Sequence, residues 1–300
     1  MTASPAASPQ RSTWFRPTTL LARGQLLVLL SLIILTVGAW ALTVHQARTM
    51  DMPMGVVARG GATDDMSDMD GMAGMASSGM AGMADTGWTR DAFATFLVAW
   101  VVMMAAMMFP AAAPMLLMFR KVHSQRQAQG RAFVPTWVFA AGYLVVWTAA
   151  GVVTWVLVQA GSDLAGRMEV GSRETWAPIA LVGVLLVAGL YQLTPLKRVC
   201  LDHCRTPLGF VMTHWQEGYR GSLRMGLVHG AFCLGCCWAL FAVLIAAGVM
   251  SLAWMALLTL IIFAEKVLPM GRRGPAAIGV VFLVLGILVA AGGTDLPWIA

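Results

Sequence analysis

Long apolar runs separated by short polar segments form the dominant pattern along this chain. Each run is close to the ~20 residues that an α-helix needs to cross the ~30 Å hydrocarbon core of a bilayer. The seven runs lie at roughly 25–44, 93–118, 134–158, 176–194, 225–247, 250–266 and 275–292. The pattern therefore predicts an all-α, polytopic bundle of about seven transmembrane helices.

Composition agrees with a membrane protein and argues against both a soluble domain and a nucleic-acid-binding protein. Hydrophobic residues make up 59% of the chain and charged residues only 11%, against roughly 25% charged residues in a soluble domain. The formal charge of +6 does not indicate nucleic-acid binding, because the basic residues are spread over the short segments between the runs. Such residues set the orientation of membrane helices.

The distribution of Lys and Arg predicts the orientation. With a cytosolic N-terminus, 15 of the 20 basic residues fall on the inner side, which is a strong positive-inside signal. The first run is long for a signal peptide and is predicted to stay as an anchor. We therefore expect a multi-pass protein of the bacterial inner membrane, divided as follows: 1–44, cytosolic tail and first anchor; 45–92, periplasmic loop; 93–292, membrane domain of six spans; 293–300, periplasmic tail.

The periplasmic loop is rich in methionine, with Asp, Gly, Ala and Ser around it, and its composition predicts disorder. Thioethers are soft ligands that need no deprotonation, so the loop is a candidate capture segment for copper(I). The alternative is a low-complexity linker. The nine candidate ligands are Met50, Met52, Met54, Met66, Met69, Met72, Met75, Met80 and Met83.

A second group of candidate ligands lies within the fifth run, which reads HGAFCLGCCW. On a helix, His229, Cys233, Cys236 and Cys237 share a stripe roughly 100° wide. Imidazole and thiolate on one face of a membrane helix suit a soft metal ion. The alternative is that these side chains only pack.

The second run carries Met103, Met104, Met107 and Met108 at one-turn spacings, followed by Pro110 and Pro114. The MxxxM spacing is similar to that of eukaryotic high-affinity copper transporters, although Met is also a common space-filler in helix cores. We expect these sulfurs to lie at the same membrane depth as the cysteines of the fifth run. Sequence does not show whether the two helices touch.

A third cluster, Cys200, His203 and Cys204, follows the fourth run in a predicted cytosolic loop, where reduced thiols can bind metal or act as a redox pair. The Glu265–Lys266 pair at the end of the sixth run is predicted to form a local ion pair or cap. Glu265 is also a candidate supporting group for the metal site.

Several stretches resemble a family of bacterial integral membrane proteins with a predicted metal-binding role. They are AWVVMMAAMMFPAAAPM (99–115), AGYLVVWTAAG (141–151), YQLTPLKRVCLDHCRTPLGF (191–210), GLVHGAFCLGCCWAL (226–240), GVMSLAWMALL (248–258) and EKVLP (265–269). The resemblance covers about 93–292 and implies metal binding without naming the ion. The methionine-rich loop lies outside it.

The leading hypothesis is a membrane protein that binds a soft metal ion, copper(I) before zinc, and transports it or delivers it. Its expected partners are the metal, the bilayer and a metallochaperone or cuproenzyme. Sequence motifs for ATP-driven pumping are missing from the chain. Two alternatives stay open: a structural or scaffolding subunit of a membrane complex, and a membrane thiol–disulfide oxidoreductase.

Overall fold

The computed structural model describes residues 17–49, 88–167, 170–247, 252–268, 271 and 273–291, and these form helices without any strand. The all-α prediction is thereby confirmed. The methionine-rich segment 50–83 lies outside the described residues. The helices are α1 (Pro17–Thr49), α3 (Arg90–Ala128), α4 (Thr136–Gly166), α5 (Val170–Leu193), α6 (Pro195–Arg205), α7 (Pro207–His214), α8 (Gly218–Ala247), α9 (Leu252–Val267) and α10 (Arg273–Ala290).

Each of the seven apolar runs lies on a helix, but the helices are not equally suited to crossing a membrane. Among the described residues, five helices are long and apolar enough to do so, namely α1, α3, α4, α8 and α10. The broken pair α5–α6, bent by 66°, would be a sixth span. Helix α9 has only 16 residues, fewer than the ~20 of a full crossing.

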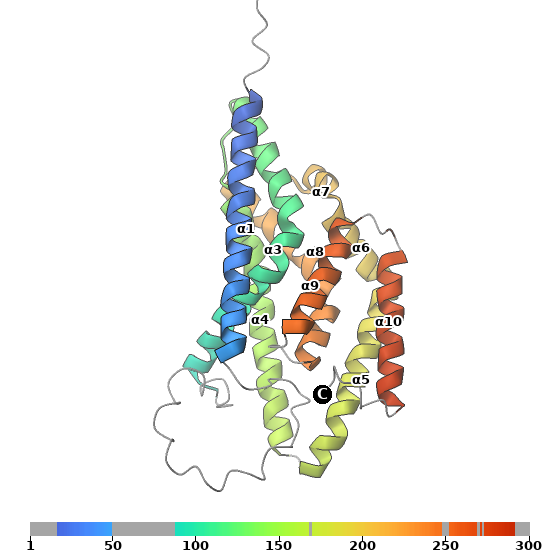
Figure 1. Ribbon diagram of the computed structural model, residues 1–300. Helices are drawn as coiled ribbons and strands as arrows, with labels where there is room; N and C mark the ends of the chain where they lie inside the picture. The colour runs from blue at the N-terminus through green and yellow to red at the C-terminus, as the bar shows by residue number, and fades with distance from the viewer. Residues whose placement is uncertain are drawn as a thin grey trace, which may run out of the picture.

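Helices α8 and α9 occupy the middle of the bundle, with α1 and α3 on one side and α5 and α10 on the other (Figure 1). Helix α8 packs closely on α4 because glycine stands at the crossing. A Cβ on Gly226 would collide with the carbonyl oxygen of Phe139, and a Cβ on Gly142 would collide with that of Leu223. Small residues at a crossing of this kind allow two helices to approach closely.

Helix α3 continues through both of its prolines. Pro110 has no N–H, so the carbonyl of Ala106, four residues earlier, loses its helical donor. The indole nitrogen of Trp40 on α1 donates to that carbonyl at 3.2 Å. A neighbouring helix thus satisfies the group that proline frees, as is required of a buried backbone carbonyl.

Helix α6 begins where α5 breaks, at Thr194 and Pro195. The Thr194 hydroxyl accepts a hydrogen bond from the backbone N–H of Lys197 at 3.3 Å, and Pro195 occupies the first helical turn. Both features are typical of a helix start. The segment predicted as a cytosolic cysteine loop is therefore a helix that returns to the bundle, with Cys200 and Cys204 on its buried side.

Candidate metal centre

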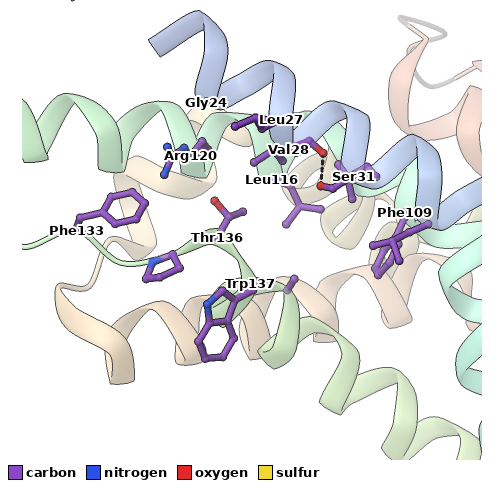
Figure 2. A pocket seen from close by; sticks show the side chains of 14 residues that line it. Gly24, Leu27, Val28, Ser31, Phe109, Leu116, Arg120, Phe133, Thr136 and Trp137 are labelled. Carbon is purple, nitrogen blue, oxygen red and sulfur yellow. Dashed lines mark hydrogen bonds between the residues drawn. The ribbon is translucent and has the colours of Figure 1, made fainter. Parts of the chain in front are cut away.

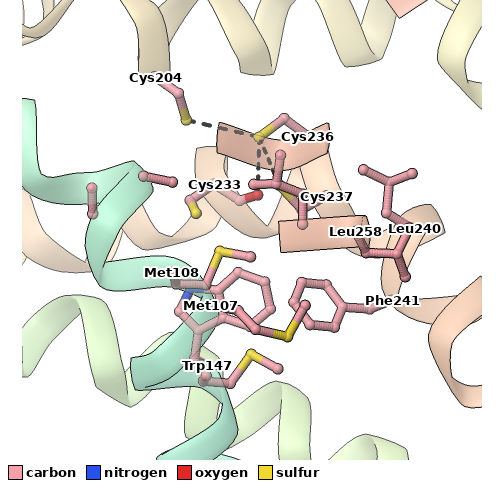
Figure 3. Close-up of a cluster of buried hydrophobic side chains, with 14 of the residues drawn as sticks. Met107, Met108, Trp147, Cys204, Cys233, Cys236, Cys237, Leu240, Phe241 and Leu258 are labelled. Atoms are coloured by element: carbon pink, nitrogen blue, oxygen red, sulfur yellow. Dashed lines mark hydrogen bonds between the residues drawn. The ribbon is translucent and has the colours of Figure 1, made fainter. Parts of the chain in front are cut away.

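Three thiols of α8 lie in the interior of the bundle. Cys233, Cys236 and Cys237 are each about 1% exposed. The Cys236 thiol donates to the carbonyl oxygen of Cys233 at 3.1 Å, which fixes its direction along the helix, and its sulfur lies 3.3 Å from that of Cys237 (Figure 3). The side-chain stripe predicted from the sequence is thus buried in the protein and does not face lipid.

A fourth thiol arrives from α6. The sulfur of Cys204 lies 3.9 Å from that of Cys236, and Figure 3 shows it facing the α8 cysteines from the opposite side of the cluster. Cys200, one turn earlier on α6, fits into the space left by Gly235, where a Cβ would lie 2.8 Å from its sulfur. Two cysteine groups predicted at different places along the chain therefore converge. We call Cys204, Cys233, Cys236 and Cys237 the sulfur cluster.

Lys266 of α9 completes the surroundings of Cys233. Its ammonium Nζ lies 2.9 Å from the Cys233 sulfur and 3.9 Å from the Met108 sulfur, although the side chain is only 7% exposed. The Tyr143 hydroxyl lies 3.0 Å from the same Cys233 sulfur. A cation and a hydroxyl directed at one buried sulfur are the partners that a thiolate requires away from water.

Glu265 pairs with a residue other than the one expected. Its carboxylate lies 2.7 Å from the Nζ of Lys197, and both side chains are almost completely buried. Lys266 points to sulfur instead, so the expected local Glu265–Lys266 pair is wrong. On a helix, adjacent residues point in directions about 100° apart, which sends Glu265 towards α6 and Lys266 towards α8.

Polar contacts near the start and at the end of helix α6 join it to α9 and to the residues that follow α9. Besides the Lys197–Glu265 pair, Arg205 donates through Nε to the carbonyl of Glu265 and through its Nη1 to the carbonyl of Gly271 at 3.0 Å. These contacts hold α6 against the bundle and position Cys204. One Glu265 oxygen, Oε1, has no hydrogen-bond partner among the described residues.

His229 lies one turn before Cys233 and is 3% exposed. Its ring sits among those of Phe139, Tyr143 and Phe210, at centroid distances of 5.8, 5.9 and 5.2 Å. Nδ1 has no partner in the part of the chain that the structure describes. His229 therefore borders the sulfur cluster from inside an aromatic enclosure.

His203 takes a different position from the cysteines beside it. Its Nδ1 lies 2.8 Å from the carbonyl oxygen of Val199 in its own helix, and its ring stacks on Phe232 with centroids 4.0 Å apart. This residue thus lies on the outer side of α6, against the flank of α8. The structure does not bring it together with Cys200 and Cys204.

The methionines of α3 share the interior with the cysteines. Met103, Met104, Met107 and Met108 are between 0 and 6% exposed. Figure 3 shows Met107 and Met108 between the cysteines and the rings of Trp147 and Phe241, so side chains of α3 and α8 share one buried core. Of the four, Met108 makes the contact with Lys266.

The ligand chemistry of this centre is dominated by sulfur. Within the described residues, no group of three or more His, Cys, Asp or Glu side chains has the arrangement of a metal site. A structural zinc site needs four such ligands in a tetrahedron. Thiolate and thioether sulfur, which this buried centre offers, are soft ligands that suit soft metal ions such as copper(I).

Two residues beside the cluster escaped sequence reasoning. Tyr143 was not among the predicted site residues, and Lys266 was predicted only as the partner of Glu265 in a local ion pair or cap. Its place at the end of an apolar run gave no signal, because long basic side chains there ordinarily reach out to the membrane interface. Its partner could not be named, since Cys233 is remote along the chain.

Together these features define an all-helical protein with a buried cluster of cysteine and methionine sulfur. The chain belongs to the PpoB2 family, described as copper chaperone, which matches residues 97–289. The matched part contains the sulfur cluster, the α3 methionines and Lys266; it excludes α1 and the methionine-rich segment. No curated protein and no solved structure matches the chain.

Proposed function

We propose that this protein is a membrane-embedded carrier that holds copper(I) in the sulfur cluster and passes it to a partner protein. The observation that carries the proposal is the meeting of Cys204 from α6 with Cys236 from α8 at 3.9 Å. Two thiols from different helices form a site that a partner protein can open by displacing α6 from the contacts of Lys197 and Arg205 that hold it. Such a site suits delivery of copper better than permanent storage.

Charge balance supports copper(I) as the cargo. A copper(I) ion held by two thiolates carries a net charge of −1, which is costly to bury in a low-dielectric interior. The Lys266 ammonium, 2.9 Å from Cys233, compensates that charge. A divalent ion on the same two thiolates would leave an excess positive charge beside Lys266.

Exposed apolar surface supports a location in the bilayer. Large hydrophobic side chains on the outside include Leu27 at 67%, Ile34 at 68%, Leu157 at 67% and Ile287 at 61% exposure. Lipid is the solvent that such surfaces require. With the orientation predicted from Lys and Arg, this is the bacterial inner membrane, and the cysteines of α6 lie towards the cytosolic side.

A route for copper follows from the same orientation. Thioethers of the methionine-rich segment capture the ion outside, Met103, Met104, Met107 and Met108 relay it, and the sulfur cluster binds it more tightly. His229 borders this final site. A cytosolic or periplasmic metallochaperone or a cuproenzyme receives the ion, and the chain itself catalyses no reaction.

The test is the copper content of protein purified without oxygen from copper-supplemented cells. We expect stoichiometric copper in the native protein and its loss in the Cys236→Ser, Cys237→Ser double variant. Cys200→Ser is the matched control, because Cys200 lies on α6 one turn from Cys204 and is equally buried, but contacts Gly235. Equal copper in all three proteins would refute the proposed site.

Thiol–disulfide chemistry is the second candidate function, and the distance between Cys204 and Cys236 favours it. A shift of roughly 2 Å would bring the two sulfurs to the ~2.05 Å of a disulfide. Thiol trapping in growing cells distinguishes the two functions. Cycling of Cys204 and Cys236 between reduced and oxidised forms, with no bound copper, would support an oxidoreductase.

A further inference from the structure

A cavity of about 390 Å³ lies between α1, α3 and the start of α4, away from the sulfur cluster (Figure 2). Its volume is typical of a small-molecule site. Its apolar wall includes Leu27, Leu32, Leu35, Phe109 and Leu116. The cavity opens sideways between exposed residues, since Leu27 is 67% and Trp137 66% exposed. In a membrane, this opening faces the lipid.

One end of the cavity is polar. Figure 2 shows Arg120 beneath Gly24 and Thr136 pointing into the space between the helices. The guanidinium fits there because residue 24 is glycine: a Cβ would lie 2.8 Å from its Nη2. The other side of the guanidinium covers the Phe133 ring, with Cζ 4.6 Å from the centroid. Arg120 is thus held in place at the mouth of the cavity.

The polar groups at this end lack partners. Arg120 Nε and Thr136 Oγ1 are buried without a hydrogen bond to any described residue. Two nearby cations, unlike Arg120, have a counter-charge: Arg126 and Arg131 both pair with Glu217, at 2.5 and 3.3 Å. None of the ion pairs among the described residues includes Arg120. A buried donor without a partner is costly, so an external acceptor is expected.

The position of Arg120 along α3 indicates the depth of this acceptor. Arg120 is the first charged residue after Asp91, at the end of the long apolar stretch of the helix. Basic residues at the end of a membrane helix lie at the level of the lipid headgroups. Basic pockets between membrane helices on the cytosolic side bind anionic headgroups.

We propose that this cavity binds an anionic phospholipid. Its phosphate accepts hydrogen bonds from Arg120 and Thr136, and an acyl chain lies along Leu116 and Phe109. The apolar wall distinguishes this ligand from a free phosphate, which would use only the polar end. The bound lipid fills the groove between α1 and α3 and so fixes the first helix on the copper-binding part of the chain.

The test is lipid titration of the delipidated full-length protein in detergent, followed by native mass spectrometry. The probes are phosphatidylglycerol, phosphatidylcholine and inorganic phosphate. We expect phosphatidylglycerol to bind more tightly than phosphatidylcholine, and Arg120→Gln to weaken it about fivefold, the effect of one basic residue at a membrane surface. The matched control is Lys121→Gln, which removes the same charge from an exposed neighbour outside the cavity.

Three results would overturn the proposal. The first is an equal loss of phosphatidylglycerol affinity in Arg120→Gln and Lys121→Gln. The second is equal affinity of the native protein for the two lipids. The third is Arg120-dependent binding of inorganic phosphate that is as tight as the binding of the lipid. If Arg120→Gln fails to fold, Thr136→Val removes only one donor to the phosphate and is expected to weaken the binding of phosphatidylglycerol, whereas unchanged binding would contradict the proposal. Copper content should stay unchanged in all these variants, so failure here leaves the copper proposal standing.

Discussion

Lys266 offers the sharpest test of the metal centre. Its ammonium is the cation nearest to Cys233, at 2.9 Å, in an interior with little water. Replacing Lys266 by Met keeps an unbranched side chain of similar length and removes the charge. We expect this change to weaken copper(I) binding strongly while the fold persists.

The magnitude follows from the geometry. Two unit charges 2.9 Å apart attract by about 6 kcal/mol at an effective dielectric constant of ~20. Part of this gain is lost to desolvation, and removing one partner of a buried pair typically costs about 3–5 kcal/mol. In the copper-free variant, the cost of burying an unpaired thiolate does not arise, because Cys233 can remain a neutral thiol. When copper is bound, Cys233 must stay a thiolate, so the affinity should fall about a hundredfold to several thousandfold.

The assay is competition for copper(I) against a chromogenic chelator, with thermal unfolding as the check on folding. Lys266→Arg is the matched control, because it keeps the positive charge next to Cys233, and it should retain most of the affinity. If the Lys266→Met variant binds copper(I) as tightly as the native protein does, the charge-compensation argument is refuted. An equally large loss in Lys266→Arg would refute it as well.

Three further predictions concern the same bundle. Met108→Leu nearly conserves volume and should cost less than about 1.5 kcal/mol of stability. It should nevertheless lower the copper affinity measurably in the chelator assay, and an unchanged affinity would exclude this thioether as a ligand. Glu265→Gln leaves the Lys197 ammonium buried without its counter-charge and should destabilise the protein by about 3–5 kcal/mol, seen as a lower melting temperature; an unchanged melting temperature would contradict it. Gly226→Ala forces a Cβ into the α4 backbone and should cost about 1–3 kcal/mol. Gly183→Ala, with nothing within 4 Å, should be neutral or stabilise by up to ~1 kcal/mol, and equal effects of the two changes would show that the crossing tolerates a side chain.

Local sequence was sufficient for the helices and for part of the site. The apolar runs predicted every long helix. The spacing of Cys233, Cys236 and Cys237 placed their sulfurs on one side of a helix. These predictions succeed because helix periodicity and bilayer thickness act on neighbouring residues.

The break between α5 and α6 shows where local reasoning was incomplete. Thr194 and Pro195 begin helix α6, yet the segment after them was interpreted as a cytosolic loop. The alternating burial of α6, with Cys200 and Cys204 inward and His203 outward, depends on its docking against α8 and α9. Docking is fixed by the Lys197–Glu265 pair, whose members are far apart along the chain.

By itself, the sequence determined the class of this protein: an all-helical chain with long apolar helices, rich in soft sulfur ligands. Only the tertiary structure decided which of those sulfurs meet. It joined Cys204 to Cys236, directed Lys266 at Cys233, and left His203 outside. The physical reason is that the direction of a side chain along one helix follows from the 3.6-residue period, whereas contact between helices follows from packing and charge pairing across the whole bundle.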